Sequence, residues 1–213
     1  MKLRIMLADD HQMFRDALRS LLEKADDLVV VAETGNGLEV VNLARANLPD
    51  IVCMDIGMPG MNGIETTRCL LAASPDIKVI ALSAYSDQRF VLDMMRAGAS
   101  AYVTKAEAGS ELLRAINAVR QNRNYFCPDV ANVVMDALSK EGDQSKPVAQ
   151  LGARERQTLQ LVAEGYTSAQ IAEQMHIAAS TVEVHRRNIM RKLNMHSVAE
   201  LTRYAIHSGL APT

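Results

Sequence analysis

The sequence has few cysteines, no long hydrophobic run and almost no net charge. Its 213 residues include three cysteines, an odd number without C-x-x-C spacing, which argues against a disulfide framework and against a zinc site. No apolar run approaches the roughly 18 residues that a membrane span needs. The amino terminus, MKLRIMLADD, turns acidic too early for a signal peptide. These absences predict a cytoplasmic protein with no membrane partner.

The formal net charge of −2 conceals an uneven distribution. Residues 1–122 contain 13 Lys and Arg residues against 16 Asp and Glu residues, whereas residues 151–213 contain seven against five. Four cations accompany a single acid within residues 183–192. From charge alone, a solvated helix face is the simpler explanation of that cluster. The total charge therefore does not exclude a protein that binds nucleic acid.

The first 122 residues alternate between two hydrophobic periods. Five short apolar runs rich in β-branched residues are separated by stretches with helical spacing, such as Phe14, Leu18 and Leu22. This alternation predicts an α/β domain whose parallel five-stranded sheet is covered on both faces. The predicted strands are Leu3–Ala8, Leu28–Ala32, Ile51–Met54, Val79–Leu82 and Ala101–Val103.

The remaining residues predict a linker and a helical domain. Within the linker, residues 123–150, Lys140–Pro147 is polar with Gly and Pro, while Pro128–Leu138 has the spacing of a short helix. Residues 151–213 show helical spacing only, with Gly165 placed to end the first helix and Ser180 and Glu183 spaced as a capping box. The four helices are expected at Arg154–Glu164, Ser168–Met175, Ser180–Leu193 and Ser197–Ser208.

Polar residues follow four of the predicted strands. Asp9 and Asp10 come after the first strand, and Asp55 comes directly after the third. Adjacent parallel strands would bring these carboxylates together, and their repulsion favours a hard divalent cation such as Mg²⁺. Ser83 and Lys105 come after the fourth and fifth predicted strands, so the same site could bind an anion such as phosphate. Solvation of the sheet rim is the alternative explanation for any single one of these residues.

The motifs around these residues resemble the receiver domain of two-component response regulators. They are Asp9-Asp10, the segment MDIGMPGMNG at residues 54–63, Leu82-Ser83-Ala84 and Tyr102-Val-Thr-Lys105, in the family's order and spacing. The resemblance implies a flavodoxin-like (βα)5 fold in which Asp55 accepts a phosphoryl group from a histidine kinase. It also implies that Asp10, Asp55 and the carbonyl of Gly57 hold Mg²⁺, and that Asp9 supports the ion through water. Lys105 would neutralise the phosphoryl oxygens. Ser83 and Tyr102 would be the residues that change position on phosphorylation, the switch residues.

Two positions depart from the commonest receiver pattern. Ala106 follows Lys105 where many receivers have proline. Gly57 has no side chain to orient an attacking water molecule. The resemblance therefore predicts the phosphoacceptor but leaves open how long the phosphorylated state lasts.

The third predicted helix of the second domain has two chemically different faces. Val182, Ile189 and Leu193 form its inner stripe, and His185 near that stripe is interpreted as a packed histidine. The opposite face combines a carboxylate, guanidinium groups, an amide and a small apolar group, which is chemistry suited to base edges in a major groove. Its residues are Glu183, Val184, Arg187, Asn188 and Arg191, with Thr181 and Lys192 at the ends placed for phosphate contacts.

This domain resembles the LuxR-type helix-turn-helix domain. The matching segments are LGARER from Leu151, VAEGYTSAQIA from Val162, STVEVH from Ser180 and Arg191-Lys-Leu193. A receiver followed by this module is similar to the NarL/FixJ type of response regulator. The resemblance implies double-stranded promoter DNA with paired half-sites, RNA polymerase and a second copy of the chain as partners. It implies a dimer contact through the fourth helix, represented by Ser197, Leu201, Tyr204 and Ala205.

Three hypotheses for function follow from these patterns. A phosphorylation-switched transcription factor, without enzymatic turnover beyond slow autodephosphorylation, agrees with both sets of motifs. In the second hypothesis, the protein is a Mg²⁺-dependent phosphotransfer enzyme or phosphatase, and its last helices dock another protein. A docking helix would show an apolar stripe on its outer face, whereas that face of residues 183–191 is polar. A regulator that senses a lipid-like molecule would need an enclosed apolar pocket in place of a strand-end Asp55.

Overall fold

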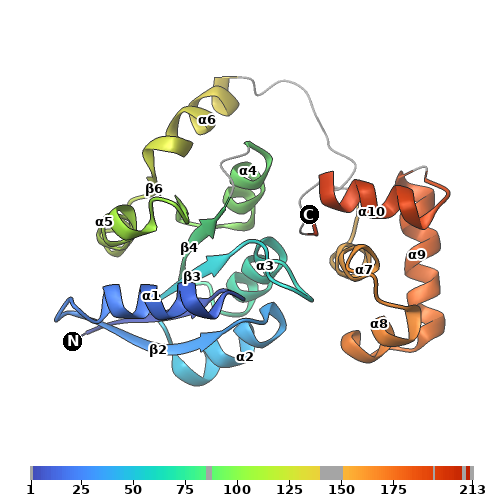
Figure 1. The fold of residues 1–213 in the computed structure, drawn as a ribbon, viewed down its shortest axis with the longest axis horizontal. Coiled ribbons are helices and arrows are strands. Elements are labelled where there is room, and N and C mark those ends of the chain that lie inside the picture. The colour runs from blue at the N-terminus through green and yellow to red at the C-terminus, as the bar shows by residue number, and fades with distance from the viewer. Residues whose placement is uncertain (1, 85–87, 140–150, 194, 208–209, 212–213) are drawn as a thin grey trace. The chain divides into compact units, whose positions relative to one another are not determined.

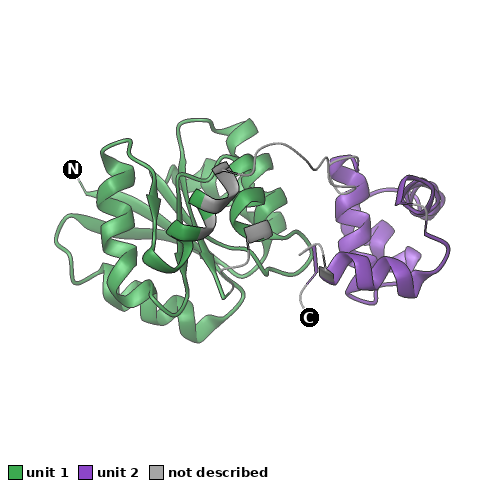
Figure 2. Ribbon diagram, turned by 90° about the horizontal axis from the view of Figure 1, so that it is seen from above, with its two compact units in different colours: residues 1–141 green, residues 142–213 purple. Residues whose placement is uncertain are grey.

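The computed structural model describes residues 2–84, 88–139, 151–193, 195–207 and 210–211, and the chain divides into two compact units, Met1–Glu141 and Gly142–Thr213 (Figure 2). The first unit contains a parallel sheet in the order β2-β1-β3-β4-β5-β6 (Figure 1). Its strands are β1 (Leu3–Ala8), β2 (Leu28–Thr34), β3 (Ile51–Asp55), β4 (Lys78–Ser83), β5 (Ala101–Thr104) and β6 (Tyr125–Phe126).

Helices cover both faces of this sheet. One core cluster joins the sheet to α1 and α5 through residues such as Leu18 and Leu112, and the other joins it to α2, α3, α4 and α6 through residues such as Val40 and Met94. The helices are α1 (Gln12–Leu22), α2 (Gly37–Asn47), α3 (Gly63–Ala73), α4 (Gln88–Ala97), α5 (Ala108–Arg120) and α6 (Pro128–Ser139). The predicted doubly covered α/β fold is confirmed.

The sheet has six strands rather than the predicted five. Residues 123–139, predicted to be part of the linker, contain β6 and α6 of the first unit. The N–H of Tyr125 donates to the carbonyl of Ser100 at 3.1 Å, and the N–H of Cys127 donates to that of Tyr102 at 3.1 Å. Cys127 and Val130 are fully buried in the core. A two-residue strand carries no periodic signal, so only its partner strand reveals it. The polar segment predicted at Lys140–Pro147 lies outside the described residues.

The second unit is the predicted bundle of helices. Its described helices are α7 (Ala153–Ala163), α8 (Ser168–Met175), α9 (Ala179–Leu193) and α10 (Val198–His207). Gly165 has a φ of 89°, the left-handed conformation that favours glycine after a helix, so its predicted role at the end of α7 is confirmed. The turn between α8 and α9 passes through His176, which is also left-handed with a φ of 53°. Two small apolar clusters hold the four helices together.

Candidate functional site

The predicted carboxylate site lies where β1 and β3 end. These two strands are neighbours, and β2 lies on the other side of β1, so the direction of strand order reverses at this point. Such switch points open a crevice at the carboxyl ends of parallel strands. Asp9 follows β1 and Asp55 is the last residue of β3, and both are almost completely buried, whereas Asp10 is exposed. The topology therefore brings together the three acids predicted from the sequence.

The donor atoms at this site suit a divalent cation. Ligand atoms from Asp9, Asp10, Asp55 and the adjacent His11 all lie within 4.8 Å of one another. Three carboxylates supply the hard oxygen donors that Mg²⁺ prefers. The residues present therefore fit the predicted ion.

Lys105 supplies the positive charge of the site. Its Nζ lies 2.7 Å from Oδ2 of Asp9 and 3.0 Å from Oδ2 of Asp55, and it also lies over the ring of Phe14. The N–H of Lys105 donates to the carbonyl of Ser83 at 2.7 Å, which ties the end of β5 to the end of β4. Burial disfavours the ammonium, but the two carboxylates outweigh burial and raise the pKa of Lys105. The lysine is therefore charged and aimed at the carboxylate of Asp55.

The electrostatic balance at Asp55 favours a bound cation. Burial and the charge of Asp9 raise the pKa of Asp55 to about 6, although Lys105 acts in the opposite direction. One ammonium thus does not compensate two buried carboxylates, and added positive charge would stabilise their ionised forms. This imbalance is a physical reason for the site to take a divalent ion.

A close backbone approach holds Asp55 in place. A Cβ added to Gly63, the first residue of α3, would lie 2.0 Å from the carbonyl oxygen of Asp55, so no side chain fits there. The N–H of Gly63 also donates to the carbonyl of Ile56 at 2.9 Å. Gly57 is exposed, and its N–H donates to Oδ1 of Asp55 at 3.3 Å. The loop after β3 therefore surrounds the carboxylate on the side where Gly57 was predicted to contribute a carbonyl.

The two predicted switch residues occupy neighbouring strands. Ser83 ends β4 and is buried one residue beyond Leu82, which pairs with Asp55. Tyr102 lies in the middle of β5, is fully buried, and pairs with Phe126 of β6. The serine is therefore near the acid, while the tyrosine connects the sheet to β6.

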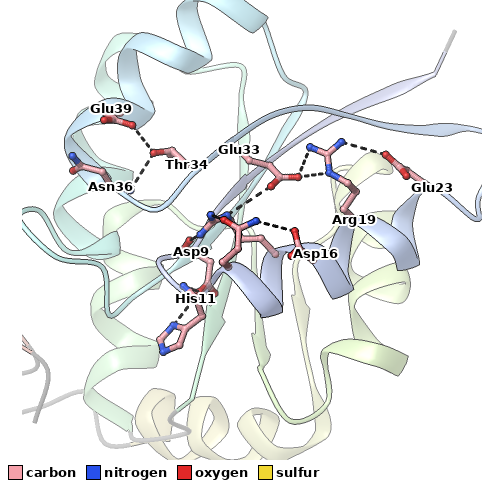
Figure 3. Close-up of polar contacts among 11 residues, drawn as sticks. Asp9, His11, Asp16, Arg19, Glu23, Glu33, Thr34, Asn36 and Glu39 are labelled. Atoms are coloured by element: carbon pink, nitrogen blue, oxygen red, sulfur yellow. Dashed lines mark hydrogen bonds and ion pairs between the residues drawn. The ribbon is translucent and has the colours of Figure 1, made fainter.

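Two residues outside the predicted site, His11 and Arg15, contact Asp9. The Nδ1 of His11 lies 3.2 Å from Oδ1 of Asp9 and 2.7 Å from Oδ1 of Asp10. The guanidinium of Arg15 donates to the carbonyl of Asp9 and lies near Glu33, which also pairs with Arg19 at 2.5 Å (Figure 3). His11 directly follows the two acids in the sequence, and Arg15 lies one helical turn further on. This spacing from the acid pair is the sequence feature that indicates both residues lie near the site.

The polar face predicted for α9 is present. Val182 and Ile189 are fully buried, as the inner stripe requires, while Glu183, Val184, Arg187 and Arg191 are exposed. Asn188 is half-buried and accepts a hydrogen bond from Arg191 at 3.2 Å, and Thr181 is half-buried near the start of the helix. The surface therefore offers donors, an acceptor and a small apolar group together.

Two residues of α9 have additional partners within the unit. The carboxylate of Glu183 accepts from the hydroxyl of Ser168, which also receives a 2.7 Å hydrogen bond from Arg186, so these groups join α8 to α9 instead of forming the predicted capping box. The Nζ of Lys192 lies 2.7 Å from Oε2 of Glu155 on α7. Lys192, predicted for phosphate contacts, therefore serves as an ion-pair partner within the bundle.

Two of the four residues predicted for the dimer contact, Leu201 and Ala205, are buried, whereas Ser197 and Tyr204 are half-buried. Leu201 and Ala205 are fully buried in the same apolar cluster as Leu159 and Ile189, so they are unavailable to a second copy of the chain. Tyr204 packs half-buried against that cluster. The hydroxyl of Ser197 accepts from the N–H of Glu200 at 3.2 Å, which is a capping role. The apolar stripe of this helix closes the core of its own bundle.

Replacing Glu155 by alanine is expected to destabilise the second unit by about 1–3 kcal/mol. The change would remove the carboxylate that pairs with Lys192, which is also the acceptor that receives the N–H of Gly152 at 2.7 Å. Burial alone would raise the pKa of Glu155, but these hydrogen bonds outweigh it and lower the pKa. The stabilisation is therefore present at neutral pH and declines as the carboxylate is protonated in acid.

Urea unfolding of the intact chain, followed at neutral and acid pH, measures this effect. Glu173→Ala is the matched control, since Glu173 is exposed on α8. Equal unfolding midpoints for the two variants at neutral pH would contradict the role given to Glu155.

Comparisons with known proteins agree with both halves of this description. Residues 5–117 match the family of response regulator receiver domains, and residues 149–205 match the luxR family of bacterial regulatory proteins. The chain is a two-component response regulator. It belongs with the NarL/FixJ-type members of that family, which carry a LuxR-type helix-turn-helix domain and regulate transcription.

Curated relatives and solved structures match this response regulator over most of its length. It is 34% identical to the response regulator UvrY of Escherichia coli K12, over 97% of the chain and 94% of UvrY, and 35% identical to LiaR of Bacillus subtilis 168, over 98% and 99%. The crystal structure of ChrA, from a heme-sensing two-component system, is 33% identical over 98% of both chains with a TM-score of 0.53. A LuxR-family regulator from Aurantimonas covers 66% of this chain and all of its own, at 36% identity and a TM-score of 0.63.

These findings decide among the hypotheses drawn from the sequence. The family is one of transcription regulators, so neither the phosphatase nor the lipid sensor is supported. Within the residues that the structure describes, no helix has both the length and the apolar character to cross a membrane.

Proposed function

We propose that this response regulator is switched by transfer of a phosphoryl group from a histidine kinase to Asp55. The observation that supports this most directly is the position of the Asp55 carboxylate, which lies 3.0 Å from Lys105 at a strand end and beside two further acids. Such a site combines a nucleophilic carboxylate with positive charge for the incoming phosphoryl oxygens.

The transfer is a substitution at phosphorus. A carboxylate oxygen of Asp55 forms a bond to phosphorus while the bond to the nitrogen of the kinase phosphohistidine breaks, and the histidine leaves with the bonding electrons. Lys105 stays within reach of the phosphoryl oxygens because β5 holds its backbone against Ser83. Asp9, Asp10 and Asp55, with the carbonyl of Gly57, would hold Mg²⁺, which when bound offsets the negative charge of the reacting groups.

Phosphorylation would change the contacts at the ends of β4 and β5. The acyl phosphate adds nearly two negative charges beside Ser83, whose hydroxyl can donate to it. Tyr102 is packed in the core next to β6, so a shift of Ser83 at the end of β4 would be transmitted through β5 to β6 and α6. Because α6 precedes the second unit in the chain, this route leads toward the DNA-binding domain.

The phosphorylated chain would bind promoter DNA through α9. Arg187 and Arg191 would contact base edges together with Glu183, Val184 and Asn188, and Thr181 would contact phosphate. Because few side chains reach the bases, two copies on paired half-sites are needed for tight binding, so we propose a homodimer that engages RNA polymerase at promoters. Leu201 and Ala205 take no part in this dimer contact.

Phosphotransfer coupled to DNA selection tests the proposal. The intact chain is incubated with radiolabelled acetyl phosphate, with and without Mg²⁺, and then used to select sequences from a random DNA library. Labelling should require Mg²⁺, and the selected DNA should contain paired half-sites that are enriched by phosphorylation. Enrichment of the same sequences to the same extent without phosphorylation would contradict the switch.

Replacing Asp10 by asparagine should weaken Mg²⁺ binding by about tenfold or more, because one of the oxygen ligands loses its charge. Isothermal titration of the intact chain with Mg²⁺ measures the change. Asp26→Asn is the matched control, because Asp26 is an exposed acid in the turn between α1 and β2. If both variants bind Mg²⁺ as the native chain does, Asp10 is not a ligand.

A further inference from the structure

The carboxylate of Glu183, on the exposed face of α9, is held in place from α8. Its Oε1 atom accepts a hydrogen bond from the hydroxyl of Ser168 and lies 3.6 Å from the guanidinium of Arg186. Arg186 also donates to the Ser168 hydroxyl at 2.7 Å, so the three groups contact one another. Thr167 and Gln170 already form the capping box of α8, so the start of that helix does not require the Ser168 hydroxyl. These contacts therefore fix the direction of a side chain on the face proposed to bind DNA.

The same contacts leave Glu183 unpaired with Arg187. A glutamate four residues before an arginine on a helix has the spacing of a favourable ion pair. Glu183 nevertheless pairs with Arg186, three residues on, and Arg187 makes no ion pair with any residue that the structure describes. The Oε2 atom of Glu183 has no hydrogen-bond partner among the described residues, and the side chain is 53% exposed. One carboxylate oxygen and one guanidinium are therefore available to an external ligand.

A fixed carboxylate on a DNA-binding face favours one base over the other three. A carboxylate only accepts hydrogen bonds, and in the major groove only the amino groups of cytosine and adenine donate them. The adenine amino group lies beside the N7 acceptor, which repels a carboxylate, whereas the cytosine amino group lies beside a C–H group. Guanine and thymine present acceptors at this edge, which also repel it. A carboxylate already held in one orientation loses little entropy on contact, so cytosine is the base that it suits.

We propose that Glu183 reads a cytosine in each half-site by accepting a hydrogen bond from its N4 amino group, and that Ser168 and Arg186 are the positioning residues for this contact. The inference rests on the proposed function, since it concerns the same face of α9. Arg187, one helical turn further on, stays available for a guanine at a neighbouring base pair. Without the Ser168 hydroxyl, the carboxylate is released toward Arg187, and both base contacts weaken. In this way α8 contributes to sequence recognition without touching a base.

The base preference of the intact chain tests this assignment. The native chain, Glu183→Ala, Ser168→Ala and Ser168→Thr each select sequences from a random duplex library in the presence of acetyl phosphate and Mg²⁺. Ser168→Thr keeps the hydroxyl, and Glu173→Ala is the matched control because Glu173 is an exposed acid of α8. Fluorescence anisotropy then measures the affinity of each chain for the selected duplex. A second duplex carries 2-pyrimidinone, which lacks the amino group but still pairs with guanine, in place of the selected cytosine.

The native chain should bind the duplex without the amino group about fivefold more weakly, and Glu183→Ala should bind the two duplexes equally. Ser168→Ala should reduce the difference to about twofold, while Ser168→Thr and Glu173→Ala retain it. A contact that only stabilises the fold would weaken binding of Ser168→Ala to both duplexes alike. That result, or the same cytosine preference in the native chain and Glu183→Ala, would overturn the assignment while leaving the proposed function intact. Failure of the native chain to select any sequence would contradict the proposed DNA binding, and this inference with it.

Discussion

Replacing Asp55 by asparagine is expected to abolish labelling of the chain by acetyl phosphate. Asp55 is the acid that lies at the end of β3 and within 3.0 Å of the Lys105 ammonium. An asparagine amide has nearly the same shape but cannot act as the nucleophile toward phosphorus. An acyl phosphate is hydrolysed rapidly in alkali, so the product is measured by phosphate-affinity electrophoresis at neutral pH.

The fold of this variant should remain intact. Burial and the charge of Asp9 both disfavour an ionised Asp55, so removing the charge relieves repulsion within the site. The thermal midpoint of Asp55→Asn is therefore expected to equal or exceed that of the native chain in the presence of a chelator. Asp26→Asn again serves as the control and should label normally. Full labelling of Asp55→Asn in a folded sample would show that another residue is the phosphoacceptor.

Replacing Arg187 by alanine is expected to weaken binding to the selected DNA by about 1–3 kcal/mol, or about 5- to 150-fold. Arg187 lies on the exposed face of α9, between Glu183 and Arg191, and makes no ion pair with any residue that the structure describes. A guanidinium there is free to donate two hydrogen bonds to a guanine in the major groove. Loss of that contact should also relax base preference at one position of each half-site.

A conservative variant separates base recognition from simple charge. Arg187→Lys keeps the positive charge but lacks the planar pair of donors, so it should retain the salt dependence of binding and still lose specificity. Fluorescence anisotropy at several salt concentrations, with native and mutated half-sites, measures both effects. If Arg187→Lys discriminates between bases as the native chain does, Arg187 contacts the phosphate backbone and not a base edge.

The elements with strong periodicity were predicted well because each buries a face that its own residues define. The five principal strands and the inner stripe of α9, with Val182 and Ile189, follow from that rule. The strand formed by Tyr125 and Phe126 was missed because two residues have no period, and its hydrogen bonds come from β5. α6 was expected at the correct place, but its packing against the rest of the first unit depends on Cys127 and Val130 reaching a core formed by distant residues.

At the functional sites, too, residues whose role follows from spacing along the chain were predictable, and residues whose role depends on a distant partner were not. The carboxylates were predictable because parallel strands with a known alternation must end at one edge of the sheet. The burial of Leu201 and Ala205 was not predictable, since a buried side chain and a dimer contact look alike on a helical wheel, and neither was the ion-pair partner of Lys192. Only the position of α7 shows that the first two close a core and that the third pairs with Glu155.

By itself, the sequence determined that one part of this chain gathers acids at a sheet edge and that another carries a basic helix, because both depend on spacing along the chain. The near-neutral total charge hid these two parts, and counting them separately revealed them. Only the tertiary structure decided which polar groups meet: Lys105 between Asp9 and Asp55, and His11 against Asp9 and Asp10. The physical reason is that hydrogen bonds and ion pairs depend on ångström-scale distances between segments, which hydrophobic periodicity does not encode.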